Sequence, residues 1–118
     1  MFYRQRVRYI EPGWVSGDYG GRTETWDPTE GATITSVPFG VDVQPWISTE
    51  VLEDGTRVAK TIGIQLHTPP GRDLVLPDRA LVEFQGDLWR VAGTKRWPSD
   101  QWPSGVDHVV YSLERKEG

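Results

Sequence analysis

The sequence contains no cysteine, which removes several kinds of chemistry at once. Disulfide frameworks, thiolate nucleophiles, iron–sulfur clusters and cysteine zinc sites all need that residue. There are only two histidines, His67 and His108, and neither has a second histidine at a metal-binding spacing. An alternative is that the two meet in space and that Asp73 or Asp107 completes a site. We expect ordinary strand histidines instead.

Catalytic motifs are absent as well. The sequence has no G-x-S-x-G nucleophile elbow, no H-E-x-x-H zinc motif and no phosphate-binding glycine loop before a helix. Acidic residues are plentiful, but a barrel of 118 residues has little room for the cleft in which a glycosidase pairs two carboxylates. We therefore predict that the protein is not an enzyme, with no catalytic residue, no metal and no cofactor.

Long hydrophobic runs are also missing. No apolar run approaches the ~18 residues of a membrane span, and the first residues do not have the pattern of a signal peptide. Six Trp, four Tyr and three Phe are nevertheless more aromatic residues than a disordered chain carries. At 118 residues, we expect one soluble domain that spans residues 1–118.

Charge is distributed unevenly along the chain. Residues 11–54 hold nine acidic residues against one basic residue, whereas the rest of the chain carries +4. This asymmetry is typical either of two ordinary solvated surfaces or of a protein that meets unlike partners on different faces. An isoelectric point near 5.1 argues against a protein that grips DNA, because phosphate binding needs a basic groove.

The dominant hydrophobic period is two, which is typical of β-strands. The clearest strand covers residues 58–66, and a closing strand covers residues 108–113. Hairpin turns are expected at Asp54-Gly55 and at residues 85–87. A long strand is expected over residues 32–46, with a bulge, a bend or an edge position where it contains proline and glycine.

Six to eight short strands separated by turns predict an all-β fold, either a small barrel or a sandwich. Long loops are expected at about residues 11–31, 46–57 and 95–107. At most one short helix is expected, around residues 76–81, with Asp78 as its cap.

Two tryptophans repeat a short unit, Trp97-Pro98-Ser99 and Trp102-Pro103-Ser104. Each proline holds the tryptophan before it in an extended conformation. Two interpretations are open: the rings either stack on a sugar, a base or a partner subunit, or they fold back over one end of the barrel.

Residues 76–93 resemble a pattern in small head-completion proteins of long-tailed phages. In that pattern an acidic or polar residue precedes a strand, a glycine forms the turn after it, and an aromatic residue and a valine lie in the returning strand. Asp78, Gly86 and Trp89 match these positions, and we interpret them as residues that set the fold. Residues 108–115 are similar to the closing strand of the same family.

The N-terminal half is similar to head-to-tail stopper proteins of phages that infect actinobacteria. The similarity lies in Asp18-Tyr19-Gly20-Gly21 and in residues 40–45. The resemblance implies a small β-barrel that forms a ring beneath the portal and adaptor. This ring would extend the DNA channel, close it after packaging and receive the tail.

The resemblance also implies partners and a location. The partners are other copies of the chain, the adaptor or portal side of the head, a tail terminator or tail tube, and passing double-stranded DNA without sequence recognition. No membrane is involved. The location is the head–tail junction of the virion, after assembly in the host cytoplasm.

Site residues follow from the same resemblance. Residues 46–57 and 11–27 are candidates for the channel lumen. The candidate channel or plug residues are Glu50, Glu53, Asp54 and Gly55. The candidate contacts with a neighbouring subunit or ring are Arg4, Arg6, Arg8, Trp97 and Trp102. Two alternatives remain: a tail terminator or other connector protein, and a carbohydrate-binding β-module that uses its tryptophans as a stacking platform.

Overall fold

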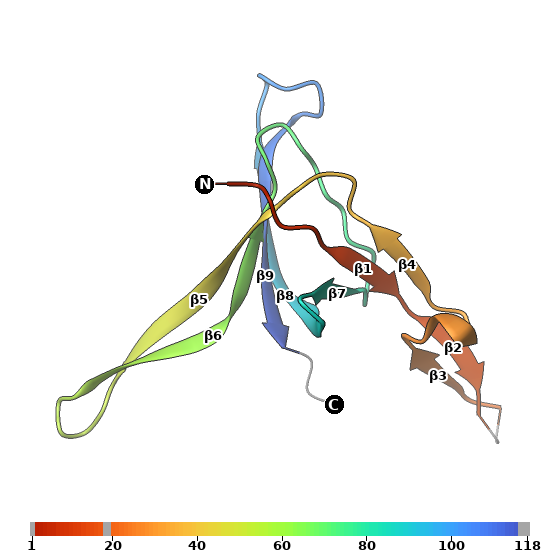
Figure 1. Cartoon of the computed structure of the whole chain (residues 1–118), viewed down its shortest axis with the longest axis horizontal. Helices are drawn as coiled ribbons and strands as arrows, with labels where there is room; N and C mark the ends of the chain where they lie inside the picture. Colours follow the sequence, from red (N-terminus) through yellow and green to blue (C-terminus); the bar gives the residue numbers. More distant parts are fainter. Residues whose placement is uncertain (1, 18–19, 116–118) are drawn as a thin grey trace.

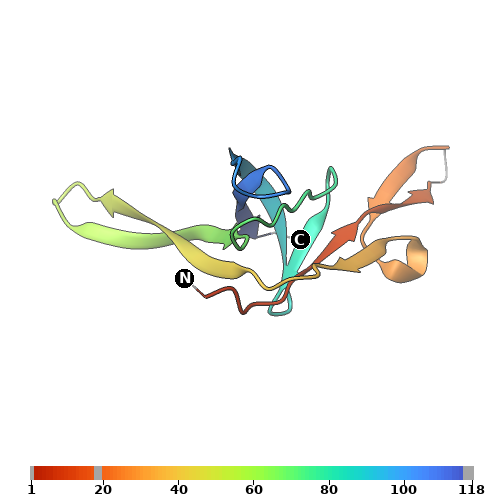
Figure 2. The ribbon, with the colours of Figure 1, turned by 90° about the horizontal axis from the view of Figure 1, so that it is seen from above.

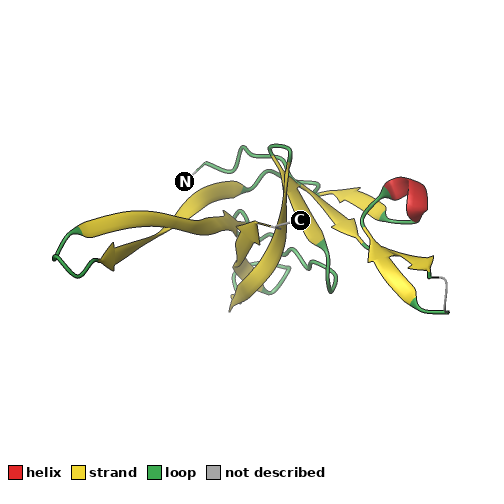
Figure 3. Ribbon diagram, turned by 90° about the horizontal axis from the view of Figure 1, so that it is seen from below, coloured by secondary structure: helices red, strands yellow, loops and turns green. Residues whose placement is uncertain are grey.

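The structure is a computed structural model that describes residues 2–17 and 20–115, without the side chains of residues 47–50 and 59–62. Within this part the chain forms nine β-strands and one 3₁₀ helix, so the predicted all-β class is confirmed (Figure 3). The elements are β1 (Arg8–Glu11), β2 (Gly13–Ser16), β3 (Arg22–Thr25), η1 (Pro28–Glu30), β4 (Thr33–Ser36), β5 (Asp42–Val51), β6 (Arg57–His67), β7 (Leu81–Phe84), β8 (Asp87–Pro98) and β9 (Val106–Arg115). None of the described helical residues forms a segment long and apolar enough to cross a membrane.

Seven strands form one curled antiparallel sheet in the order β4-β1-β7-β8-β9-β6-β5, and β2 and β3 form a separate hairpin. The curled sheet is an incomplete barrel (Figure 1). A bridge between Gln5 and Val41 ties the segment before β1 to the residue before β5, with two N–H···O bonds of 3.0 and 2.9 Å. The chain that leaves edge strand β4 therefore returns past the N-terminal segment and becomes the opposite edge strand, β5.

A continuous strand over residues 32–46 is wrong, because the structure divides it into β4 and β5, but the bend expected at its proline and glycine is present. Residues 37–41 bend between them and carry the chain from one edge of the sheet to the other. Gly40 is needed at this bend, since a Cβ atom there would overlap the carbonyl oxygen of Tyr3. The proline and glycine therefore mark a crossing between sheet edges.

Other local predictions are confirmed. The hairpin tip at Asp54-Gly55 separates β5 from β6, and Gln85 and Gly86 form the two-residue turn between β7 and β8, with φ of 51° and 82°. Such a turn with two positive φ angles matches the twist of the flanking strands. The clearest predicted strand lies within β6, and the closing strand lies within β9.

The prediction of at most one short helix is confirmed for the described residues, but its expected place at residues 76–81 is wrong. The chain makes one turn there, in which the Ala80 N–H donates to the Pro77 carbonyl oxygen, and then enters β7. Arg79 has a φ of 64°, a left-handed conformation that interrupts any right-handed helix. The only helix in the described part is η1, where Asp27 is the N-cap and accepts a hydrogen bond from the Thr29 N–H.

The expected long loops are also shorter than predicted. Residues 11–31 contain β2, β3 and η1, and residues 46–57 are mostly paired strand. β8 continues to Pro98, so the third loop is confined to residues 99–105 and Trp97 lies in a strand. Gly13 begins β2 close to the end of η1, because a Cβ at Gly13 would lie 2.6 Å from the Gly31 carbonyl carbon.

The hydrophobic core lies inside the curled sheet. Alternate residues of β9, namely Val109, Tyr111 and Leu113, are buried and pack with Leu66 of β6 and Val82 of β7. This alternation is what a strand with one buried face requires. The β5–β6 and β2–β3 hairpins extend away from this core as two arms (Figures 1 and 2), and the molecule measures 53 × 49 × 22 Å.

Thr68 is a fully buried polar residue that joins two segments beside the core. Its Oγ1 donates to the Arg72 carbonyl oxygen at 2.8 Å and accepts from the Val109 N–H at 2.8 Å. Thr68→Val is expected to lower the free energy of unfolding by about 3 kcal/mol, because it leaves both partners without a hydrogen bond. Urea unfolding measures the change, with Thr23→Val on the exposed face of β3 as the control. If both variants lowered the free energy of unfolding equally, this role of Thr68 would be contradicted.

Candidate functional site

The β5–β6 arm contains the candidate channel residues. β6 pairs with β9 only from Ile64 to His67, so residues 57–63 pair with β5 alone. Gly63 lies where the arm leaves the sheet, and a Cβ atom there would overlap the carbonyl oxygen of Leu113. A register shift after Trp46 occurs at the same level and bends the arm.

The tip of the arm is ordered by its own hydrogen bonds. The Leu52 N–H donates to the Thr56 carbonyl oxygen at 2.8 Å, and the Gly55 N–H donates to the Leu52 carbonyl oxygen at 2.9 Å. Asp54 accepts from the Thr56 N–H at 2.9 Å, and this bond lowers the pKa of the carboxyl group. Glu53, Asp54 and Gly55 are exposed, so the tip presents negative charge at neutral pH. The side chain of Glu50 lies outside the described residues.

Apolar side chains on this arm are left uncovered. Val51 is 65% exposed, Leu52 46%, Val58 43% and Trp46 43%. A two-stranded hairpin in water is at best marginally stable unless a further strand or surface supports it. The arm therefore has the composition of a segment that packs against a partner.

The three N-terminal arginines are exposed at alternate positions, and together they are called the arginine face. Arg4, Arg6 and Arg8 are exposed, whereas Val7 between them is buried. Arg8 forms an ion pair with Glu83 of β7 at 2.6 Å. The guanidinium of Arg4 lies 5.0 Å from the ring centre of Phe2, and within the described residues neither Arg4 nor Arg6 forms an ion pair. Two cations therefore remain available on this face.

The structure separates the two tryptophans of the repeated unit. The Trp102 ring covers Gly71, where an added Cβ would lie 2.7 Å from it, and its Nε1 donates to Asp107 at 3.3 Å. Trp102 thus folds back over one end of the barrel. Trp97 stacks on His108 with the ring centres 6.0 Å apart and remains 49% exposed. The two rings therefore have different environments, and Trp102 remains 38% exposed.

The histidines lie in strands, as expected, and have different surroundings. His108 Nδ1 lies 2.6 Å from Asp107 Oδ2, and this contact lowers the pKa of the Asp107 carboxyl group. Burial lowers the pKa of His67, while Asp73 is paired with Arg96 at 2.9 Å. Across residues 2–17 and 20–115, no group of three or more His, Asp or Glu side chains is placed to hold a metal ion.

The second candidate segment, residues 11–27, forms the β2–β3 arm. Trp14 is 49% exposed, and the Arg22 guanidinium lies 5.4 Å from its ring centre. At the base of this arm, Glu24 forms an ion pair with Arg79 of the main domain. Asp18 and Tyr19, which contribute to the stopper resemblance, lie outside the described residues.

A groove also lies beside β8, and no local sequence pattern indicates it. No known protein family model matches the sequence, and no curated protein matches it significantly.

Proposed function

We propose that the protein is a structural subunit of the phage head–tail junction. In this proposal it forms a ring that extends the DNA channel, closes it after packaging and docks the tail. The main support is the β5–β6 arm, which leaves the barrel with four exposed apolar side chains and no third strand. An arm of this kind is incomplete in a monomer and suits a subunit that contacts a neighbour.

The ring part of the proposal is supported by the form of the molecule. In a ring each subunit meets its neighbours through two different surfaces, so one subunit needs two unlike faces. The two arms and the arginine face supply such unlike surfaces, and the charge of the chain is divided between an acidic segment and a basic remainder.

The channel part rests on the charge at the arm tip. Glu53 and Asp54 are exposed carboxylates, and the region from residue 11 to residue 54 carries a net charge of −8. A channel wall with this charge repels the DNA backbone, so the DNA moves past without binding tightly. We therefore assign the tip, with Glu50 and Gly55, to the lumen in this proposal.

The arginine face is proposed to contact a neighbouring subunit or ring. The triple variant Arg4→Ser, Arg6→Ser, Arg8→Ser is expected to weaken assembly on the adaptor at least tenfold, because three cations of the contact are lost. Sedimentation of the reconstituted complex measures this loss. The matched control carries Arg72→Ser, Lys95→Ser and Arg115→Ser, which lie outside both arms and change the net charge equally. If ring assembly is the same for both variants, the arginine contact is wrong.

Trp97 is a proposed contact as well, since nearly half of its surface is exposed. The carbohydrate-binding alternative has less support, because Trp102 lies on Gly71 and is 38% exposed, so only part of that ring is open to a sugar. A soluble glycan panel is therefore expected to leave the tryptophan fluorescence unchanged. A tail terminator would share these features and differ from the proposed stopper in its neighbours.

A further inference from the structure

One edge of β8 has no partner among the described strands along more than half of its length. β7 pairs with β8 only from Asp87 to Arg90, whereas β8 continues to Pro98 with β9 on its other side. Within the described chain, no backbone hydrogen bond reaches residues 91–97 from the β7 side. An open strand edge presents unpaired N–H and C=O groups to another chain.

The edge stays open because the chain before β7 is held away from it. The Ala80 N–H donates to the Pro77 carbonyl oxygen at 3.2 Å, and Arg79 adopts its left-handed conformation at this turn. Trp26 Nε1 donates to the Arg79 carbonyl oxygen at 3.3 Å, while the Arg79 side chain pairs with Glu24. Contacts from the base of the β2–β3 arm thus fix the turn.

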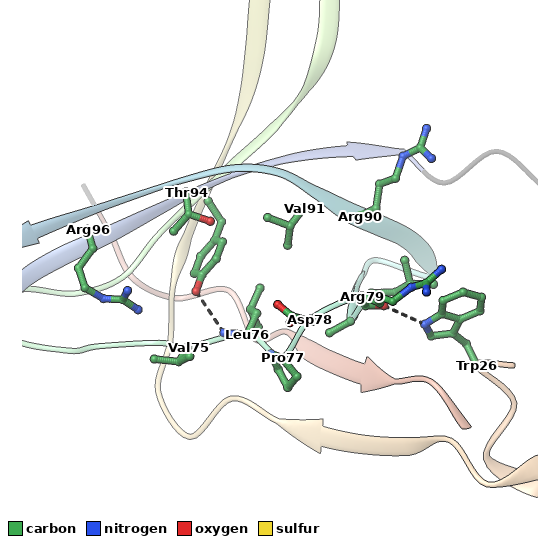
Figure 4. Close-up of a pocket in the computed structure, with 13 residues that line it drawn as sticks. Trp26, Val75, Leu76, Pro77, Asp78, Arg79, Arg90, Val91, Thr94 and Arg96 are labelled. Atoms are coloured by element: carbon green, nitrogen blue, oxygen red, sulfur yellow. Dashed lines mark hydrogen bonds between the residues drawn. The ribbon is translucent and has the colours of Figure 1, made fainter. Parts of the chain in front are cut away.

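A groove of about 640 Å³ lies between β8 and residues 75–81 (Figure 4). Leu76, Val91 and Tyr111 contribute apolar surface to it. The Tyr111 hydroxyl donates to the Leu74 carbonyl oxygen at 2.6 Å and accepts from the Leu76 N–H at 3.1 Å. These two bonds hold the wall opposite β8 in place, so the groove is preformed.

The charged side chains that line the groove are mostly basic. Arg79, Arg90 and Arg96 lie along it with one acid, Asp78, in a chain whose net charge is −4. The arginines now pair with acids outside the groove, including Arg90 with Glu114 at 2.7 Å. The pairs of Arg90 and Arg96 are exposed, and Arg96 also donates to the Leu74 carbonyl oxygen at 3.3 Å. Exposed ion pairs contribute about 0–1 kcal/mol, so the carboxylates of a ligand can replace these two.

We infer that this groove binds an extended, acidic segment of a partner protein by β-strand addition. Main-chain hydrogen bonds to residues 91–97 supply affinity, and apolar side chains at alternate positions of the segment pack into the groove. Acidic side chains near its ends meet Arg90 and Arg96. Seven residues at ~3.3 Å each give the segment a length of ~23 Å. The inference depends on the groove alone and not on ring assembly.

The test uses two synthetic heptapeptides and the full-length protein. The acidic peptide is acetyl-Asp-Val-Thr-Ile-Thr-Val-Glu-amide, and the control replaces both acids with lysine. Amide NMR is expected to show shifts and slowed hydrogen exchange within residues 91–97 for the acidic peptide, with at least tenfold weaker binding of the lysine peptide. Two N-methylated peptides carry methyl groups on the two alternate sets of amides. Binding is expected to be abolished when the methylated amides face β8 and preserved when they face away, as strand addition requires.

A protein variant tests the arginines separately. Arg90→Ser with Arg96→Ser is expected to weaken binding of the acidic peptide at least tenfold, whereas Arg57→Ser with Arg72→Ser leaves the affinity unchanged. The inference is overturned if residues 91–97 are unaffected at millimolar acidic peptide, if the lysine peptide binds equally well, or if both N-methylated sets bind. These results concern the free protein, so they leave the ring proposal to its own test.

Discussion

Replacing Gly63 with alanine is expected to lower the free energy of unfolding by about 3 kcal/mol, at the upper end of the usual cost of overpacking. The added Cβ would overlap the carbonyl oxygen of Leu113, where β6 passes β9 at the base of the arm. A backbone atom in a paired strand moves only if the pairing moves with it. Making room for the added Cβ atom would therefore weaken the pairing of β6 with β9 as well as relieve the overlap. Urea unfolding measures the difference.

The control for this prediction is Gly21→Ala. Among the residues that the structure describes, no atom lies within 4 Å of a Cβ added at Gly21, and its backbone does not occupy the left-handed region. A change of less than about 0.5 kcal/mol is expected, as at an ordinary surface position. If Gly63→Ala were as mild as Gly21→Ala, the close passage of β6 and β9 would be wrong, and with it the geometry that directs the arm.

Reversing the charge of the arm tip is expected to have the second large effect. Glu53→Lys with Asp54→Lys changes each tip by four charge units, and a ring repeats that change in every subunit. In the proposed channel the lysines would attract DNA phosphates that the native carboxylates repel. The yield of infectious particles is expected to fall at least tenfold, with ring assembly retained. Plaque titre and electron microscopy measure the two quantities.

The neutral variant Glu53→Gln with Asp54→Asn separates charge from structure. Asparagine retains an acceptor for the Thr56 N–H, so the turn is preserved. An intermediate titre is expected, because repulsion is lost but attraction is not introduced. Unchanged infectivity of the lysine variant would contradict the placement of the tip in the lumen.

The sequence predicted features that depend on neighbouring residues. The alternation across β6 and β9, and the turns at Asp54-Gly55 and Gln85-Gly86, follow from local preference and from one buried face. The exposure of Arg4, Arg6 and Arg8 follows from the same period of two.

Features set by distant contacts were not predictable in this way. Residues 32–46 divide into two strands because the chain crosses beside Tyr3, and the helix expected at residues 76–81 is replaced by a turn that Trp26 holds. Trp97 and Trp102 begin the same Trp-Pro-Ser unit, yet a covering contact on Gly71 distinguishes them. The groove beside β8 was missed for the same reason, since it exists only where β7 stops early.

Electron microscopy of the particles that contain this protein, or of its co-purified complex, tests the central proposal most directly. The proposal predicts a ring between an adaptor and a tail tube, with residues 46–57 of every copy directed into the lumen. A lone monomer that carries a ligand on Trp97, or a ring with its arm tips outside the channel, would contradict it.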